Sequence, residues 1–263
     1  FENSELEFNI ETASNDSYLK SHKIKSAITN NNSLLNSFLS LKANNEDLYL
    51  ETKVEAYEDL TKENTSDRYQ YLLPSFELSK NFNNNLNLNS NGYLKNYDTN
   101  VFEKVLINDL KYSSIPRIES SGFVSKFNLL LKNVSTESDN SKEYTNKFRS
   151  QNYGSILYDI LYPLKKEVNT FDNFLTGKAS FMYSPNKNKN VKNFDRIIDI
   201  NNIYSQNRLG LDDSVEGGQS ITLGGEYKIT DKENNSILTA GLASVLRDKK
   251  EDKLPINSTI NNK

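Results

Sequence analysis

Apolar and polar residues alternate along most of this chain, and alternate side chains of a β-strand point to opposite faces. In residues 5–11, for example, Leu6, Phe8 and Ile10 alternate with acids and an amide. The pattern predicts about ten to twelve strands. We expect them at residues 5–11, 18–28, 37–43, 48–57, 72–78, 86–94, 102–112, 123–132, 156–164, 175–183, 219–229 and 236–246.

The length of these runs indicates the kind of β-protein. Many extend for about ten residues, close to the ~9–11 that a tilted strand needs to cross a bilayer, whereas strands of globular proteins average about five or six. No run approaches the ~18 apolar residues of a spanning helix, which excludes a helical membrane protein. We therefore predict an all-β fold, an antiparallel up-and-down meander that forms part of a large transmembrane β-barrel and is incomplete and unclosed.

The segments between the runs have the composition of turns. Residues 12–17, 61–67 and 230–235 are rich in Asn, Asp and Ser, which tolerate turn conformations. Two connections, 135–152 and 185–218, are predicted to be long, and residues 141–150 either form a short helix or no regular structure. Alternation of short periplasmic turns with long extracellular loops is typical of outer-membrane barrels.

Alternation also predicts which side chains meet lipid and which line a lumen. The expected lipid-facing side chains are Leu6, Phe8, Ile10, Leu48, Leu50, Val54, Phe127, Leu129, Ile221, Leu223 and Tyr227. The expected lumen-facing side chains are Glu7, Glu51, Lys53, Glu55, Asn128 and Glu226. Leu72, Pro74, Phe76 and Leu78 are expected to share one face.

Composition fits this prediction but does not prove it. Hydrophobic residues make up 35% and mean hydropathy is −0.71, which alone favours disorder. The 15 Tyr and 13 Phe argue against disorder. Barrels combine a polar lumen with aromatic girdles, although a soluble β-sandwich also fits the composition. The net charge of −3 is spread evenly, so no basic patch indicates a nucleic-acid partner.

No set of residues indicates catalysis, so we expect no enzyme activity and no cofactor. The chain has no cysteine, and its one histidine, His22, lies in a predicted basic strand without a nearby nucleophile signature. Neither Gly217-Gly218 nor Gly224-Gly225 belongs to a phosphate-binding pattern. The acids between 212 and 217 do not follow calcium-loop spacing, so we expect no metal site and a turn whose acids pair with Arg208 or a basic loop.

One long motif resembles a known family. Residues 202–218 read NIYSQNRLGLDDSVEGG, similar to the segment N-L-F-S-x-N-R-[FY]-x-G-x-D-R-x-E-G-G of the lipopolysaccharide-assembly outer-membrane protein LptD (organic solvent tolerance) family, in its alphaproteobacterial form. The matching residues are Asn207, Arg208, Gly210, Asp212, Glu216, Gly217 and Gly218. Asp213-Ser214 replace a single family arginine, and one residue fewer separates Arg208 from Gly210.

Two flanking stretches, and one near the start of the chain, agree with the same family in the same order. Residues 179–185 resemble the strand ending in W-S-P that precedes the motif. Residues 246–258, with Leu246-Arg247-Asp248 and Leu254-Pro255-Ile256-Asn257-Ser258, resemble the stretch that follows it. Residues 18–24 resemble a Y-L-R-R-Y-D-F strand.

The resemblance implies a function and a set of partners. The family inserts lipopolysaccharide into the outer leaflet through a polar lumen, with lateral exit of the acyl chains. Its partners are the lipoprotein LptE as lumen plug, a periplasmic Lpt bridge and outer-membrane lipid, and its location is the Gram-negative cell outer membrane. Residues 1–263 are then the central portion of the barrel domain, with the amino-terminal jelly roll and the terminal strands outside it. A porin, a TonB-type importer and a secreted β-sandwich adhesin remain alternatives.

The motif itself is expected to fold as a unit. Residues 197–218 are predicted to pack against the barrel wall or into the lumen, with Arg208 paired to Asp212 or Glu216. The seven matching residues are then candidates for contact with the lumen or the plug. Residues 186–193, which are basic and rich in asparagine, are predicted to be mobile.

Overall fold

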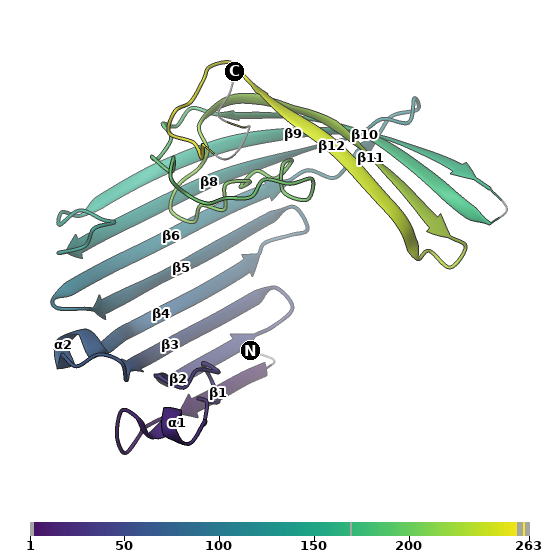
Figure 1. Cartoon of the computed structure of the whole chain (residues 1–263). Helices are drawn as coiled ribbons and strands as arrows, with labels where there is room; N and C mark the ends of the chain where they lie inside the picture. The colour runs from purple at the N-terminus through teal and green to yellow at the C-terminus, as the bar shows by residue number, and fades with distance from the viewer. Residues whose placement is uncertain (1–2, 169, 257–259, 261–263) are drawn as a thin grey trace. The chain divides into compact units, whose positions relative to one another are not determined.

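The protein is almost entirely β-structure in the computed structural model, which describes residues 3–168, 170–256 and 260 (Figure 1). The only helices among these residues are the four-residue α1 (Tyr18–Ser21) and α2 (Thr65–Arg68), and neither is long or apolar enough to cross a membrane. The strands are β1 (Asn3–Asn9), β2 (Leu34–Asn44), β3 (Leu48–Asp59), β4 (Tyr69–Asn81), β5 (Leu86–Tyr97), β6 (Val101–Ser113), β7 (Arg117–Ile118), β8 (Val124–Asp139), β9 (Arg149–Glu167), β10 (Phe171–Ser184), β11 (Gly218–Asp231) and β12 (Ser236–Arg247).

Each long strand pairs with its sequence neighbour. The sheet order is β1-β2-β3-β4-β5-β6-β8-β9-β10-β11-β12, and the short β7 pairs only with β8. In the part of the chain that the structure describes, β1 and β12 are the two ends of this sheet and do not meet. The predicted unclosed antiparallel meander is therefore confirmed, and it fits part of a barrel wall.

Turn residues account for the tight reversals. Asp98 and Asn100 in the β5–β6 turn, Asn140 after β8 and Asn234 before β12 all have positive φ angles between 45° and 66°. Asn and Asp tolerate this left-handed conformation better than other residues that carry a side chain, because their short polar side chains bond to the local backbone. Local sequence therefore determines where the chain turns.

The chain divides into two compact units. Unit 1 comprises Phe1–Leu110 with Asn133–Asn152, and unit 2 comprises Lys111–Lys132 with Tyr153–Lys263. In unit 1, the connections 10–33, 60–68, 98–100 and 140–148 lie at one end of the strands, and the short turns 45–47 and 82–85 lie at the other. In unit 2, the long loop 185–217 lies at the end opposite to the connections 114–123, 168–170 and 232–235.

Unit 1 has one apolar and one polar face, as predicted. The register places Phe8 beside Leu39 and Leu39 beside Val54, and all three side chains are exposed, Phe8 by 74%. On the opposite face, Lys42 donates to Glu7 at 2.7 Å and Lys53 lies 2.8 Å from Glu55. A sheet that leaves its apolar face exposed has the surface expected of a membrane-facing wall.

Unit 2 repeats this division between faces. Tyr158 pairs with Phe181, Phe181 with Ile221, and Ile221 with Leu246, and all four side chains are exposed. On the opposite face, Ser180 donates to Asp159 at 2.5 Å and pairs with Thr222. The predicted division of side chains between the faces holds here too.

The strand predicted at residues 18–28 is wrong. Tyr18–Ser21 forms α1 and the chain then turns, so His22 is an exposed residue at the helix end and not a strand residue. The Asn15 carboxamide accepts from the Ser17 backbone N–H, which starts the turn. Leu19 packs with Leu35 and Leu60 in a small buried cluster.

The long loop predicted at residues 135–152 is also wrong. β8 continues to Asp139 and β9 begins at Arg149, which leaves only residues 140–148 between them, without a helix. Both faces of these strand ends are mostly polar, so apolar and polar residues do not alternate there and the pattern cannot predict the strands. Hydrogen bonds between neighbouring side chains stabilise them instead.

A β-bulge in β4 makes the face predicted for Leu72 wrong. The register between β4 and its neighbours shifts between Leu72 and Ser75. Leu72 therefore pairs with Glu55 on the polar face, whereas Phe76 pairs with Thr52 on the apolar face. The extra residue of a bulge reverses the alternation beyond it, so Leu72 does not share a face with Phe76.

Candidate functional site

The long loop between β10 and β11 folds onto the polar face of unit 2. Ser184 and Gly218, which flank the loop, pair with each other, so residues 185–217 leave and return at the same place on the sheet. Gln206 donates to the Ser155 hydroxyl of β9 at 2.8 Å, and Lys132 of β8 donates to the Asp212 carbonyl at 2.6 Å. Loops of this length without regular structure are usually functional or disordered, and this one is folded.

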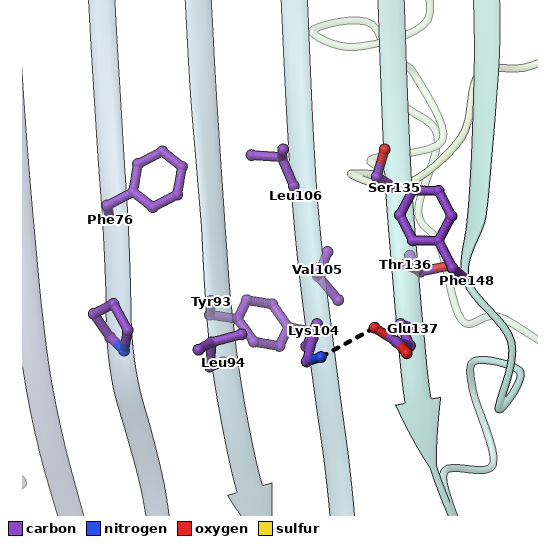
Figure 2. A pocket seen from close by; sticks show the side chains of 11 residues that line it. Phe76, Tyr93, Leu94, Lys104, Val105, Leu106, Ser135, Thr136, Glu137 and Phe148 are labelled. Atoms are coloured by element: carbon purple, nitrogen blue, oxygen red, sulfur yellow. Dashed lines mark hydrogen bonds and ion pairs between the residues drawn. The ribbon is translucent and has the colours of Figure 1, made fainter.

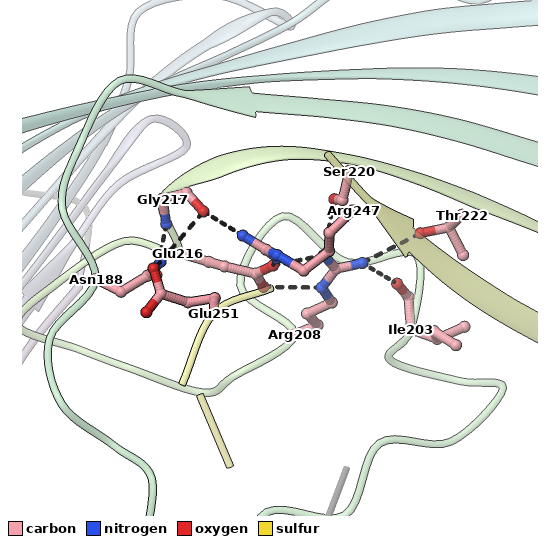
Figure 3. A network of polar contacts seen from close by, with 9 residues as sticks. All are labelled: Asn188, Ile203, Arg208, Glu216, Gly217, Ser220, Thr222, Arg247 and Glu251. Atoms are coloured by element: carbon pink, nitrogen blue, oxygen red, sulfur yellow. Dashed lines mark hydrogen bonds and ion pairs between the residues drawn. The ribbon is translucent and has the colours of Figure 1, made fainter. Parts of the chain in front are cut away.

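A buried ion pair lies at the centre of the loop (Figure 3). Arg208 donates to both carboxylate oxygens of Glu216, from Nε at 2.8 Å and from Nη2 at 2.5 Å. Arg208 is 2% exposed and Glu216 3%. Of the two partners predicted for Arg208, the structure selects Glu216, and the two-pronged geometry is the strongest form of this contact.

The sheet supplies further partners for Arg208. Its Nη2 donates to Ser220 at 2.8 Å and its Nη1 to Thr222 at 3.1 Å, both on β11. Ser220 and Thr222 are alternate residues, so their hydroxyls lie on the same face of the strand. Burial of a charge requires such compensation, and the polar face of β11 provides it.

A second arginine completes the cluster. Arg247, the last residue of β12, donates from Nη1 to Glu216 and from Nη2 to the Gly217 carbonyl. It is 6% exposed, and its Nε is buried without a partner among the residues that the structure describes. Two guanidinium groups thus share one carboxylate, and among the described residues Glu216 is the only acid that forms an ion pair with either arginine.

Glycines allow the chain to approach this cluster. A Cβ on Gly217 would lie 2.0 Å from the Asn186 carbonyl oxygen, so no larger residue fits there without movement of the backbone. Gly218 has φ +91°, a conformation that L side chains rarely adopt. Gly210 also has positive φ, and the Arg196 guanidinium lies against it. The three glycines of the motif therefore have local structural roles.

Asn207 and Asp212 have different roles from Arg208. The Asn207 carboxamide exchanges two hydrogen bonds with the Leu211 backbone, both at 3.0 Å, and so closes the turn that contains Gly210. Asp212 is exposed, and its backbone carbonyl accepts from Lys132. The alternative pairing of Arg208 with Asp212 is therefore wrong.

We expect Asp212→Ala to change the free energy of unfolding by no more than about 0.5 kcal/mol, as exposed substitutions usually do. The contact made by Asp212 uses its backbone, which alanine keeps. Equilibrium unfolding of the complete protein in detergent would measure the change. A loss as large as that from a change at Glu216 would contradict this account of the site.

Apolar contacts stabilise the loop beside the ion pair. Val191, Ile203, Leu209 and Leu211 form one buried cluster with Val245 of β12. The cluster also contains Leu254 and Ile260, which lie beyond β12. The segment after β12 thus packs with the loop, although the proposed family match at Asn257 and Ser258 lies outside the described residues.

Tyr204 brings a polar group into this apolar region. Burial raises the pKa of its phenol, and the Glu226 carboxylate adds to the rise. A Cβ on Gly224 would lie 2.4 Å from the Tyr204 hydroxyl oxygen, which has no partner among the described residues. Because Gly224 has no side chain, the Tyr204 ring can lie against the backbone of β11 at this position.

Residues 186–193, which we predicted to be mobile, make specific contacts in the structure. Asn188 accepts from the Gly217 N–H at 2.8 Å and donates to Glu251 at 2.9 Å. Lys189 lies 2.5 Å from Asp213, and Val191 is fully buried. The asparagine-rich composition concealed specific contacts, because an amide side chain can bond to a backbone as well as to water.

Sequence reasoning missed part of the site. Arg247 was singled out only as part of a flanking resemblance, and Asn188, Glu251 and Lys132 were given no role. The alternation in β12 places Arg247 on the same face as Val245, which is the one signal in the sequence for its position. In the described ranges, no group of three His, Asp or Glu side chains is placed to hold a metal ion.

Comparison with known proteins agrees with the geometry. The family model described as LPS transport system D, LptD, matches residues 2–261. A search of curated proteins finds no significant match to the chain.

Proposed function

Because this chain belongs to the LptD family of lipopolysaccharide transport proteins, we propose that it forms a central part of an outer-membrane barrel wall whose polar face lines the route of lipopolysaccharide. The family match favours lipopolysaccharide transport over the porin, importer and adhesin alternatives. Members of this family transport lipopolysaccharide, and the family is not known as one of enzymes. The location that follows is the cell outer membrane of a Gram-negative bacterium.

The observation that carries the proposal is the division between the two faces. In each unit, one face exposes Leu, Ile, Phe and Tyr side chains, and the other carries charges, hydroxyls and amides. The hydrocarbon core of a bilayer has no hydrogen-bonding groups to satisfy the polar face, whereas a water-filled lumen has. The polar face therefore suits the lumen, and the apolar face suits the bilayer.

This arrangement fits the chemistry of the substrate. Lipopolysaccharide combines an anionic saccharide with several acyl chains, and transfer of the charged part through hydrocarbon is prohibitive. A polar wall with paired charges such as Glu7 with Lys42 and Lys178 with Glu226 carries the saccharide without desolvation. The acyl chains leave sideways, at a seam formed by terminal strands outside residues 1–263.

The folded loop 185–217 gives the lumen side a defined surface. We propose that Asn207, Arg208, Gly210, Asp212, Glu216, Gly217 and Gly218 shape the passage or the seat of the plug lipoprotein LptE. Arg208 and Glu216 act by holding the loop, since both are buried. The periplasmic Lpt bridge would reach the barrel through a domain that precedes Phe1.

Site-specific photo-crosslinking tests the assignment of faces. A photoreactive phenylalanine in place of Lys53, on the polar face, is expected to capture lipopolysaccharide during transport in cells that make the complete protein. The same residue in place of Val54, on the apolar face of the same strand, is the matched control. Capture at Val54 with none at Lys53 would reverse the faces, and capture at neither position would refute passage along this wall.

A further inference from the structure

A hollow lies on the polar face of unit 1, across the neighbouring strands β3, β4 and β5. Its volume is about 310 Å³, at the lower end of the ~300–1,000 Å³ that is usual for small-molecule sites. The polar side chains that line it are Glu51, Lys53, Ser75, Glu77, Asn91 and Tyr93. All six belong to unit 1, whereas the folded loop 185–217 belongs to unit 2.

Three side chains with oxygen acceptors form one row across this hollow. Glu51 of β3 pairs with Glu77 of β4, and Glu77 pairs with Asn91 of β5. The Glu51 carboxylate accepts from the Tyr49 hydroxyl at 2.6 Å. The side chains of Glu77 and Asn91 are exposed and have no hydrogen-bond partner among the described residues. Two members of the row are therefore available to a ligand.

A second row gives the hollow its depth. Ser75 of β4 pairs with Lys53 of β3 and with Tyr93 of β5, so a short side chain lies between two long ones. Ser75 and Glu77 are alternate residues and share one face. Tyr93 also lines the apolar hollow that Figure 2 shows, whereas the next residue, Leu94, lines only that one. As the shortest side chain of its row, Ser75 forms the floor of the polar hollow.

The polar hollow carries an excess of negative charge. Glu51 and Glu77 are directly opposite each other, and like charges in such positions destabilise a sheet. Lys53, which also lines the hollow, lies 2.8 Å from Glu55 and so already has a carboxylate partner. A ligand that donates hydrogen bonds and carries no negative charge therefore fits this hollow.

We propose that the polar hollow binds an unphosphorylated sugar residue of lipopolysaccharide as the molecule passes along the wall. The inference rests on the proposed function, which places this face in the lumen. Acyl chains have no hydrogen-bond donors, and phosphate groups are repelled by the two carboxylates, so the sugars without phosphate are the parts of this lipid that fit.

The row of acceptors suits the hydroxyl groups of such a sugar. Hydroxyls donate to Glu51 and Glu77, and a hydrogen bond to an ionised acceptor is about twice as strong as one between neutral groups. The Asn91 carboxamide both donates and accepts, so it binds a further hydroxyl in either direction. The floor at Ser75 leaves space for the ring.

Binding of an oligosaccharide to the complete protein in detergent tests the proposal. The probe is the oligosaccharide released from the lipopolysaccharide of the bacterium that makes this protein, with its phosphate groups removed, and calorimetric titration measures its Kd. Glu77→Ala is expected to raise the Kd about tenfold, the effect of losing one charge-assisted hydrogen bond. Ser75→Phe is expected to abolish binding, because the ring fills the hollow. The probe with its phosphates in place should bind more weakly.

Glu5→Ala is the matched control for Glu77→Ala. Glu5 pairs with Lys42 and Lys42 with Glu51, so Glu5 lies on the same polar face two strands away. It is exposed and does not line the hollow. We expect Glu5→Ala to leave the Kd unchanged.

Four outcomes would overturn the proposal. These are equal effects of Glu77→Ala and Glu5→Ala, binding that Ser75→Phe leaves intact, equal affinity for the phosphorylated probe, and binding that is lost when a chelator removes calcium. The last would mean that the two carboxylates hold a cation. Capture of lipopolysaccharide at position 53 in cells tests the proposed function separately. If position 53 captures lipopolysaccharide and the purified protein does not bind the oligosaccharide, only the sugar site is wrong.

Discussion

Glu216→Gln is expected to lower the free energy of unfolding of the complete protein by roughly 3–5 kcal/mol, the cost of breaking a buried ion pair by removing one partner. Glu216 is the carboxylate that both Arg208 and Arg247 contact. Glutamine keeps the size of the side chain and can still accept hydrogen bonds. It leaves two buried guanidinium groups without a compensating negative charge, which is why the loss should be large.

Arg208→Met is the matched comparison. It removes one cation but leaves Glu216 with Arg247, so the cluster becomes neutral. We therefore expect a smaller loss than from Glu216→Gln, even though Arg208 makes more hydrogen bonds. Equilibrium unfolding in detergent measures both values. If Arg208→Met costs more than Glu216→Gln, hydrogen bonds and not charge balance stabilise the loop.

Two further variants in the motif show whether the loop serves transport or only assembly. We expect Arg208→Ala and Gly217→Val to leave folded barrel in the membrane but to reduce surface lipopolysaccharide, because the loop loses its defined position on the polar face. Barrel levels and surface lipopolysaccharide are measured in the same cells. Loss of the folded barrel, or normal values of both, would contradict a role in transport.

The alternation of apolar and polar residues predicted most of the strands, because a strand with one apolar and one polar face requires this alternation. The runs around Phe8, Val54 and Ile221 alternate strictly, and each lies in a strand that leaves these apolar side chains exposed. Periodicity failed where both faces are polar, as at Asn133 and Ser150, since hydrogen bonds between side chains replace the apolar face. It also failed at Leu72, where a bulge reverses the alternation.

The candidate site was predictable only in part. The motif indicated that Arg208 pairs with an acid. Only the three-dimensional structure shows that this acid is Glu216 and not Asp212. The contribution of Arg247 depends on pairing of β11 with β12, which places Ser220 opposite Arg247. Contacts of Asn188 with Gly217 and Glu251 join segments far apart in the chain. Such contacts have no local signal, because they follow from the register of the strands between them.

Leu223→Lys is expected to cost roughly 2–4 kcal/mol, the penalty for lysine on the lipid face of a barrel near mid-bilayer. Leu223 is exposed on the apolar face of β11, beside Ala179 of β10 and Ser244 of β12. Lysine fits the space, so the penalty arises from moving an ammonium group into hydrocarbon and not from steric conflict.

Glu226→Lys is the matched control on the opposite face of the same strand. Glu226 lies 2.9 Å from Lys178, so the variant replaces a partly exposed ion pair with a repulsion, which costs about 1 kcal/mol or less where water screens it. The measurement is the free energy of unfolding in lipid vesicles, repeated in a short-chain detergent, whose thin hydrocarbon layer lets water approach the protein surface. The penalty at position 223 should shrink in that detergent while that at 226 stays the same, since only the first depends on a hydrocarbon surrounding. Equal penalties at the two positions in vesicles would mean that the face carrying Leu223 does not meet lipid.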